Sequence, residues 1–271
     1  MTDAQPEPQR VANPDEDGFL YHYTSLEAFK SIIENKVLWA THIEYLNDTT
    51  ENSLMKTLVA KRLGELALHE KDPESMRRLK AQFETGERFA FFIACFSEDR
   101  GDRLSQWRAY GGSSGVCMAF NKSALEEFCL ASFDSEASIF LPVDYIPPEG
   151  NERTDERIRE ILEQVEVPNN IYYEAYLAGS ILKHDAFAEE QEWRIVTHPW
   201  NRPAKFRLRG SLLVPYIELR FDDKLKDLLA TVTLGPMNHQ QQTAESVSAM
   251  LIANRLKTTQ VRRSQIPYRG F

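Results

Sequence analysis

Apolar residues in the first part of the chain follow two periodicities, one typical of strands and one typical of helices. The segment "DGFLYHYT" predicts a first strand and "VLWAT" a second one. Between them, "TSLE" has the spacing of a capping box, so Thr24 is predicted to cap a helix whose apolar face repeats every three or four residues. Further helices are expected over residues 55–66 and from "DPESM" onward.

From residue 88 the pattern becomes richer in strands. The segments that follow predict a helix over residues 122–132, a long helical stretch over about 153–185 and a last helix over 241–256. The predicted strands of this part are "RFAFFIACF", "VCMAF", "SIFLPVDY", "EWRIVT", "FRLRGSLLVPYIELRF", "TVTLG" and "VRRSQI".

Helices gather early and strands late, without regular alternation. This order favours an α+β fold with a mixed or antiparallel sheet over a doubly wound parallel one. Residues 1–17 are polar and rich in proline and acid, and we expect a disordered tail there. We expect residues 18–271 to form a single domain.

Composition limits the classes of function. The chain has 271 residues with 42% hydrophobic and 27% charged residues, which suits a globular core, and its net charge of −9 disfavours general binding of duplex nucleic acid. Neither a secretory segment nor an apolar run long enough to span a bilayer is present, so no membrane partner is expected. The three cysteines lack the close spacing of a disulfide framework or a zinc site and predict a reduced, cytoplasmic protein.

The first candidate for chemistry is the strand end "LYHYTS". Strand alternation places His22 and Thr24 on one face and Tyr21 and Tyr23 on the other. A helix begins at once, and its first amides can attract an anion. On these residues alone, a core histidine beside a structural cap is the commoner arrangement.

The second candidate is "CFSEDRGDRLSQWRAYGGSSG", in which Ser97 ends a strand. Trp107 and Tyr110 lie three residues apart and share a face if they are helical. Two such aromatic rings can hold a flat ligand, or they can pack the helix on the sheet with Gly111 and Gly112 ending it.

The third candidate is the strand in "AEEQEWRIV". Glu192 and Arg194 are two residues apart and face the same side, while Trp193 and Ile195 face the other side, which we expect to be the core. The pair is either a surface salt bridge, worth roughly 0–1 kcal/mol, or part of a cleft.

The fourth candidate is a basic row. Alternation in "KFRLR" sends Lys205, Arg207 and Arg209 to one face, which is either solvated or able to meet phosphate. Arginines at positions 202, 262, 263 and 269 add to this group. The acids Glu189, Glu190 and Glu192 with His184 and Asp185 are bunched, but their spacing is not that of a metal site, so no metal ligands are assigned.

The motifs together resemble a large bacterial family known only as a domain of unknown function. They are "LYHYTS", "LWAT", "YLND", "CFSED", "LSQWRAYGGSSGVCMAF", "KHDAFAEEQEWRI", "TLGP" and "SQIPYR" in that order. The resemblance runs from about Phe19 to Arg269.

The layout also resembles the ADP-ribosyltransferase fold, in particular its His-Tyr-Glu class. That class carries a histidine on its first core strand, an aromatic residue that stacks on nicotinamide, and a late glutamate on a strand beside the cleft. The matching positions are His22, Tyr110 (with Trp107 as the alternative) and Glu192. Where the class often has a further tyrosine, this chain has Phe96 and Ser97, and Tyr23 is the alternative.

The resemblance implies a split β-sheet and NAD as the substrate. Glu192 would bind a ribose hydroxyl and stabilise the positive charge that develops at the ribose, Tyr110 would stack on nicotinamide, and His22 would position the adenosine ribose. Arg194 or Arg207 would meet the pyrophosphate. Tyr23, Thr24, Ser97 and Trp107 complete the expected NAD-binding residues.

We therefore expect an ADP-ribosyltransferase or another NAD-cleaving enzyme. Its acceptor would be a protein, a nucleic acid or water, and a bacterial toxin or phage-defence effector, with an antitoxin partner, fits this chemistry. Two alternatives stay open: an inactive binding module of the same fold, and a metal-dependent hydrolase or nuclease that uses the bunched acids.

Overall fold

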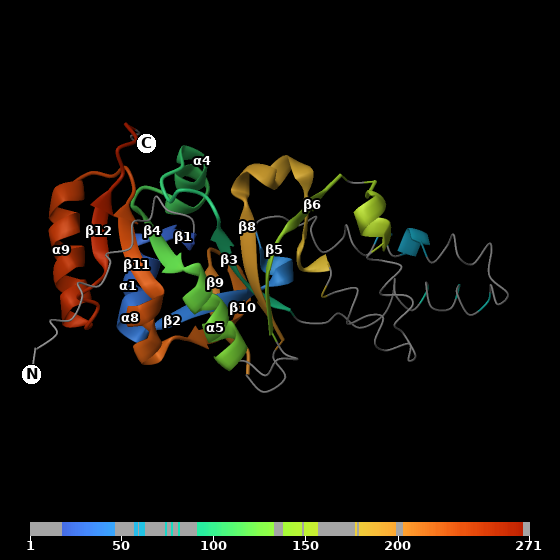
Figure 1. Cartoon of the computed structure of the whole chain (residues 1–271), viewed down its shortest axis with the longest axis horizontal. Helices are drawn as coiled ribbons and strands as arrows, with labels where there is room; N and C mark the ends of the chain where they lie inside the picture. The colour runs from blue at the N-terminus through green and yellow to red at the C-terminus, as the bar shows by residue number, and fades with distance from the viewer. Residues whose placement is uncertain are drawn as a thin grey trace, which may run out of the picture. The chain divides into compact units, whose positions relative to one another are not determined.

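The structure is a computed structural model of the whole chain (Figure 1). It describes residues 18–46, 91–132, 138–147, 149–156, 179–198 and 203–267, together with residues 57–58, 60–62, 74, 77, 81 and 177. The predicted tail at 1–17 lies outside the described residues, as do Arg202, Arg269 and most of the helices predicted over 55–66 and from residue 72.

The described residues fall into two compact units that interleave along the chain. The first unit takes the described residues within 18–35, 99–125 and 223–267, and the second those within 36–98 and 126–222. Strand pairing within the units is mixed and mostly antiparallel, which confirms the α+β class. The expectation of one domain from residue 18 onward stays a prediction.

The first unit has a four-stranded sheet in the order β12-β11-β4-β1. β1 (Phe19–Ser25), β4 (Gly115–Asn121) and β11 (Leu229–Leu234) pair antiparallel, and β12 (Gln260–Arg263) joins β11 in parallel. The helices whose bounds are described are α1 (Leu26–Asn35), α4 (Leu104–Gln106), α8 (Leu225–Leu228) and α9 (Gln240–Ala253), which lies alongside β12 (Figure 1). A π-helical turn, η2, covers Trp107–Gly111.

The second unit has a six-stranded antiparallel sheet in the order β9-β10-β2-β3-β8-β5. Its strands are β2 (Val37–His42), β3 (Phe92–Ser97), β5 (Ser138–Pro142), β8 (Glu192–Thr197), β9 (Lys205–Arg209) and β10 (Leu212–Arg220). β6 (Asp144–Ile146) and β7 (Leu182–His184) form a separate parallel pair. Short 3-10 turns cover Ile43–Tyr45 (η1) and Asp185–Glu190 (η3).

Two further elements cross from one unit to the other along the chain. α5 covers Lys122–Ser132, as predicted, and the 3-10 turn η4 covers Asp222–Lys224. The Asn121 side chain accepts a hydrogen bond from the Ala124 amide at 2.9 Å, which explains why α5 starts where β4 ends.

The structure corrects three details of the predicted elements. The cap of α1 is Ser25 and not Thr24, because the Ser25 Oγ accepts the Ala28 amide at 3.1 Å. "SIFLPVDY" forms two strands, since pairing with β8 ends at Pro142. Residues 182–184 are strand β7 instead of helix, because they pair with β6 and His184 then caps η3 through its Nδ1.

No helix within the described part of the chain combines the length and the apolar character that a membrane span requires. None of the three cysteines forms a disulfide, and Cys117 and Cys129 are buried, as expected of small apolar residues.

Candidate functional site

The Glu192 carboxylate, at the start of β8 in the second unit, lies between two cations. Arg194 donates from Nε to Oε1 at 2.8 Å and from Nη2 to Oε2 at 3.1 Å, and Lys183 donates from Nζ to Oε2 at 3.0 Å. Glu192 and Lys183 are each 5% exposed, and Arg194 is fully buried. The sequence predicted that Glu192 and Arg194 share a face, and the structure shows that this face is buried.

Charge balance at this cluster keeps the carboxylate ionised. Burial by itself raises the pKa of Glu192, but the charge and hydrogen bonds of Arg194 and the charge of Lys183 outweigh it and lower the pKa to about 2. A buried carboxylate that is ionised at neutral pH can stabilise a developing positive charge without first losing a proton.

Neighbouring groups fix the cations and the backbone of the cluster. Arg194 donates from Nη1 to the Ser180 carbonyl at 2.7 Å, and Lys183 also binds Glu190 at 2.8 Å. The Tyr145 hydroxyl accepts the Glu192 amide at 2.7 Å, and burial raises the pKa of Tyr145 to about 12. These contacts satisfy the polar groups that burial of an ion pair would otherwise leave unpaired.

Gln191 determines how the two glutamates reach one ammonium. It has φ +46°, in the left-handed region, and it ends η3 directly before β8. Its carbonyl accepts the Glu98 amide at 2.8 Å, which ties the turn to the end of β3. The turn brings the Glu190 and Glu192 carboxylates to the same Lys183 Nζ.

One expectation about β8 is corrected, and one about the neighbouring β3 is confirmed. Trp193 is half-buried and its Nε1 donates to Glu98 at 2.9 Å, so it is not in the core, whereas Ile195 is fully buried. Ser97 ends β3, as predicted. The structure places it opposite Glu192, and its hydroxyl donates to the Glu190 carbonyl at 2.5 Å.

The basic row of Lys205, Arg207 and Arg209 lies on β9, which pairs with β10 in the second unit. Arg207 is half-buried, with its guanidinium 5.1 Å from the Trp39 ring centroid and 6.0 Å from that of Tyr216. It donates to the Thr41 hydroxyl at 2.8 Å, and its Nε has no hydrogen-bond partner. Burial, followed by the charge of Arg209, lowers the pKa of Arg207. A half-buried arginine that packs on aromatic rings is suited to binding an anion.

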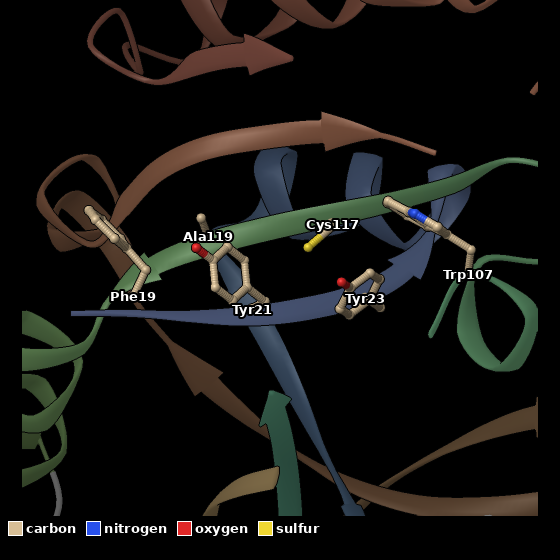
Figure 2. Packing of buried hydrophobic residues seen from close by; sticks show 6 residues of the cluster. All are labelled: Phe19, Tyr21, Tyr23, Trp107, Cys117 and Ala119. Carbon is tan, nitrogen blue, oxygen red and sulfur yellow. The ribbon is translucent and has the colours of Figure 1, made fainter. Parts of the chain in front are cut away.

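Aromatic side chains gather on one face of β1 in the first unit. Figure 2 shows Tyr21 and Tyr23 on the same side as Cys117 and Ala119 of β4, with the Trp107 ring beyond Tyr23. The Tyr23 and Trp107 rings meet edge to face with centroids 4.9 Å apart. All five side chains are buried, so this face is a packed core and Tyr23 is one of its members.

Asp99, in the loop after β3, anchors this cluster. Tyr23 donates to Asp99 at 3.1 Å, and the Gly101 amide donates to the same carboxylate at 2.7 Å. Burial, and then the charges of Cys117 and Asp99, raise the pKa of Tyr23 far above its usual range. The phenol therefore stays protonated and acts as a donor.

Asp102 joins the turn η2 to the C-terminal strand. Trp107 Nε1 donates to Asp102 at 2.7 Å, and the Ser264 hydroxyl donates to the same oxygen at 2.7 Å. The motifs "SEDRGD", "SQW" and "SQI" thus meet in one network, although 162 positions separate Asp102 from Ser264. This network holds η2, the turn that carries Tyr110, in place.

The Trp107 ring leaves no room for a side chain at Gly115 and Gly235. A Cβ at Gly235 would lie 2.8 Å from Trp107 Cε3, and one at Gly115 would lie 2.9 Å from the same atom. Trp107 is 2% exposed. Tyr110 is half-buried and packs against the same cluster, so it is the better candidate to stack on a ligand.

His22 is half-buried and pairs with Met118 of β4 in the strand register. It lies on the face of β1 opposite Tyr21 and Tyr23, as strand alternation predicted, and Thr24 shares this face.

The predicted site residues therefore form two groups. His22, Tyr23, Thr24, Trp107 and Tyr110 belong to the first unit, and Ser97, Glu192, Arg194 and Arg207 belong to the second. A groove in which His22, Tyr110 and Glu192 meet stays a prediction.

Sequence reasoning missed Lys183, Tyr145 and Asp102. The signal for Lys183 was its place in "KHDAFAEEQEWRI", one lysine before four acids. Among the described residues, no group of three or more histidines, cysteines and acids could hold a metal ion. Glu190 and Glu192 instead pair with Lys183, while His184 caps η3.

Comparison with protein families gives a match over part of the chain. A family model described as "Protein of unknown function (DUF2971)" matches residues 106–195, from Gln106 at the end of α4 to Ile195 in β8. No curated protein and no solved structure matches the chain. The motifs before residue 106 and after residue 195 lie outside the matched region.

Proposed function

We propose that the chain is an NAD-cleaving enzyme of the ADP-ribosyltransferase class, with Glu192 as its catalytic carboxylate and a split sheet of that class. The observation that supports this is the buried Glu192 carboxylate, whose pKa is lowered to about 2 by Arg194 and Lys183. Cleavage of a glycosidic bond passes through a positively charged ribose, and a fixed anion stabilises that state.

The reaction in this proposal breaks the bond between ribose C1′ and the nicotinamide nitrogen. The bonding pair leaves with nicotinamide, which becomes neutral and needs no general acid. An oxygen or nitrogen of the acceptor then forms a bond to C1′, and its proton passes to solvent. The acceptor is a macromolecule or water, and a toxin or phage-defence role with an antitoxin partner belongs to the same proposal.

In this proposal, the substrate replaces the hydrogen bond that Lys183 donates to the Glu192 carboxylate. Its ammonium binds Glu192 and Glu190 at once, at 3.0 Å and 2.8 Å. A ribose hydroxyl that binds Oε2 takes the place of Lys183, which keeps its pair with Glu190. Arg194 keeps its contact through Nε and Oε1, so the carboxylate stays oriented.

Arg194 acts as a positioning residue in this proposal. Its Nε and Nη2 bind Glu192 and its Nη1 binds the Ser180 carbonyl, and the side chain is fully buried. The pyrophosphate contact therefore falls to Arg207, while Tyr110 stacks on nicotinamide and His22 orients the adenosine ribose.

An inactive binding module of the same fold is the second candidate function. The observation that favours it is that Glu192 is 5% exposed and that both of its oxygens accept hydrogen bonds within the protein. A carboxylate satisfied in this way also fits a purely structural role, as in other buried ion clusters.

Nicotinamide release, measured together with the thermal stability of the full chain with and without NAD, tests the proposal. A ligand specific for the folded state adds about 2.7 kcal/mol at a hundredfold excess over its Kd, so Tm rises if NAD binds. We expect NAD to raise Tm, and we expect Glu192→Gln to abolish nicotinamide release. Glu190→Gln should reduce the release less, because Glu190 holds Lys183 but does not itself bind the ribose.

The two measurements distinguish the enzyme from the inactive binding module. An unmoved Tm without nicotinamide release, over a range of acceptor lysates, would overturn the enzyme and leave the binding module. If Glu192→Gln does not fold, Tyr110→Ala replaces it as the inactive variant, because its loss affects a half-buried ring. Full turnover in Tyr110→Ala contradicts the stacking role.

A further inference from the structure

Strand β9 forms an open edge of the second unit. Among the described strands, it pairs only with β10, through the register that joins Lys205 to Tyr216 and Arg209 to Leu212. Four of its five residues are exposed and Arg207 is half-buried. An open edge of this kind can pair with another chain, and proteins normally protect it.

The register shows which backbone groups of β9 face outward. A two-residue turn, Gly210–Ser211, closes the hairpin, so Arg209 and Leu212 form a hydrogen-bonded pair. Because such pairs alternate along antiparallel strands, Arg207 also bonds to β10, whereas Phe206 and Leu208 direct their N–H and C=O groups to the open edge.

One face of the hairpin is apolar and exposed. Phe206 is 60% exposed and Leu208 is 76% exposed, and Leu213, which lies directly opposite Leu208 on β10, is 55% exposed. Pro215 lies opposite Phe206 on the same face. Exposed apolar residues that cluster in this way mark a surface that other molecules cover.

The other face of β9 carries cations that are still accessible. Lys205 binds Glu218 at 2.7 Å and Arg209 donates to the Tyr45 carbonyl at 2.8 Å, both at exposed positions. Exposed contacts of this type are weak, so a new anionic partner can replace them. Arg207 is held over Trp39 and contributes less to this surface.

A second copy of the chain is a poor match for this edge. Two antiparallel copies of β9 that use their outward amides would place Arg207 opposite Arg207 and Lys205 opposite Arg209. Like charges directly opposite each other on paired strands are destabilising. The complementary strand has acidic residues on one face and apolar residues on the other.

We propose that the β9 edge binds an extended segment of a partner protein in which acidic and apolar residues alternate. The segment adds a strand beside β9, bonds to the outward groups of Phe206 and Leu208, places its acids against Lys205 and Arg209, and covers Leu208 with its apolar side chains. This surface is separate from Glu192, and the proposal does not depend on the cleavage of NAD.

Binding of labelled ten-residue peptides to the full chain, without NAD, tests this proposal. The probe alternates Glu and Val, and two controls alternate Lys with Val and Glu with Ser, so that charge and apolar face are varied one at a time. We expect the Glu–Val peptide to bind at least about tenfold more tightly than either control, with weaker binding at high salt.

Variants of β9 separate strand addition from simple charge attraction. Leu208→Pro removes one outward N–H and leaves the pairing with β10, as proline on an edge strand allows. We expect it to weaken Glu–Val binding at least about tenfold, while Leu208→Ala weakens it less. Lys205→Glu with Arg209→Glu should reverse the preference toward the Lys–Val peptide.

Several outcomes would overturn the proposal. Equal binding of the Glu–Val and Lys–Val peptides, or full binding by Leu208→Pro with an unchanged Tm, contradicts strand addition. A dimer in sedimentation that Leu208→Pro dissolves would make a second copy the occupant. Preference for single-stranded RNA over the Glu–Val peptide would make the row a phosphate-binding surface.

Discussion

The Arg194 guanidinium holds the Glu192 carboxylate through two hydrogen bonds, of 2.8 Å and 3.1 Å, although the residues are only two positions apart on β8. Both side chains lie on the same buried face, and Lys183 completes the cluster. The stability of the second unit therefore depends on a balance between two cations and two carboxylates.

Replacement of Glu192 by glutamine removes one of these carboxylates. Arg194 then stays buried with only the Ser180 carbonyl and a neutral amide, and breaking a buried pair costs about 3–5 kcal/mol. We expect the free energy of unfolding, measured by urea titration, to fall by roughly that amount. Glu190→Gln is the control and should cost less, because Glu190 is more exposed; an equal loss contradicts this account.

Acid should weaken the protein through the same residue. The pKa of Glu192 is lowered from 4.5 to about 2 in the folded state, so its contribution is complete above about pH 4.5 and disappears as the pH falls through about 2. The difference in unfolding free energy between wild type and Glu192→Gln should shrink by about 3 kcal/mol over this range. A difference that stays constant from pH 6 to pH 2 would falsify the shift.

Gly235→Ala should disturb the Trp107 ring. The new Cβ would lie 2.8 Å from Trp107 Cε3 and 3.1 Å from the Gly115 carbonyl, and such overpacking costs about 1–3 kcal/mol. Gly111→Ala is the milder control, since its Cβ would lie 3.2 Å from the ring. Thermal unfolding measures both, and Trp107→Phe, which removes the crowded ring atoms, should restore part of the loss in a double variant.

Tyr23→Phe should cost about 1–3 kcal/mol without a change in the shape of the core. The variant keeps the ring that meets Trp107 but removes the donor to Asp99, a buried carboxylate. Asp99→Asn in the Tyr23→Phe background should cost less than it does in wild type, because the two groups interact. Additive losses in urea titration would show that the bond contributes little.

Much of the fold follows from apolar periodicity. The strands around His22, Ala94, Met118 and Ile195 were expected from short apolar runs, and α5 was expected with its observed bounds. The cap of α1 and strand β7 were not, because Thr24 and Ser25 are chemically equivalent as caps and because β7 depends on pairing with β6, which local sequence does not encode.

The site was predictable only in part. Spacing on a strand placed Glu192 beside Arg194, but it could not show that both are buried, since charged residues are normally exposed. Asp102 was identified only through its contact with Ser264, 162 positions away, and Lys183 through contacts that the turn η3 brings together over seven and nine positions. The same holds for Trp107, which the sequence offered as a ligand-stacking ring and which packs against glycines in the core.

Gln191 has a consequence for how β8 can change. A left-handed φ costs a residue with a side chain roughly 1–2 kcal/mol, so the turn carries a small conformational penalty that the surrounding contacts offset. Glycine at this position would relieve the penalty, and valine would increase it. Because Gln191 lies between Glu190 and Glu192, its φ angle influences the separation of their carboxylates. A substitution there would change the pKa of Glu192 without altering any ionisable group.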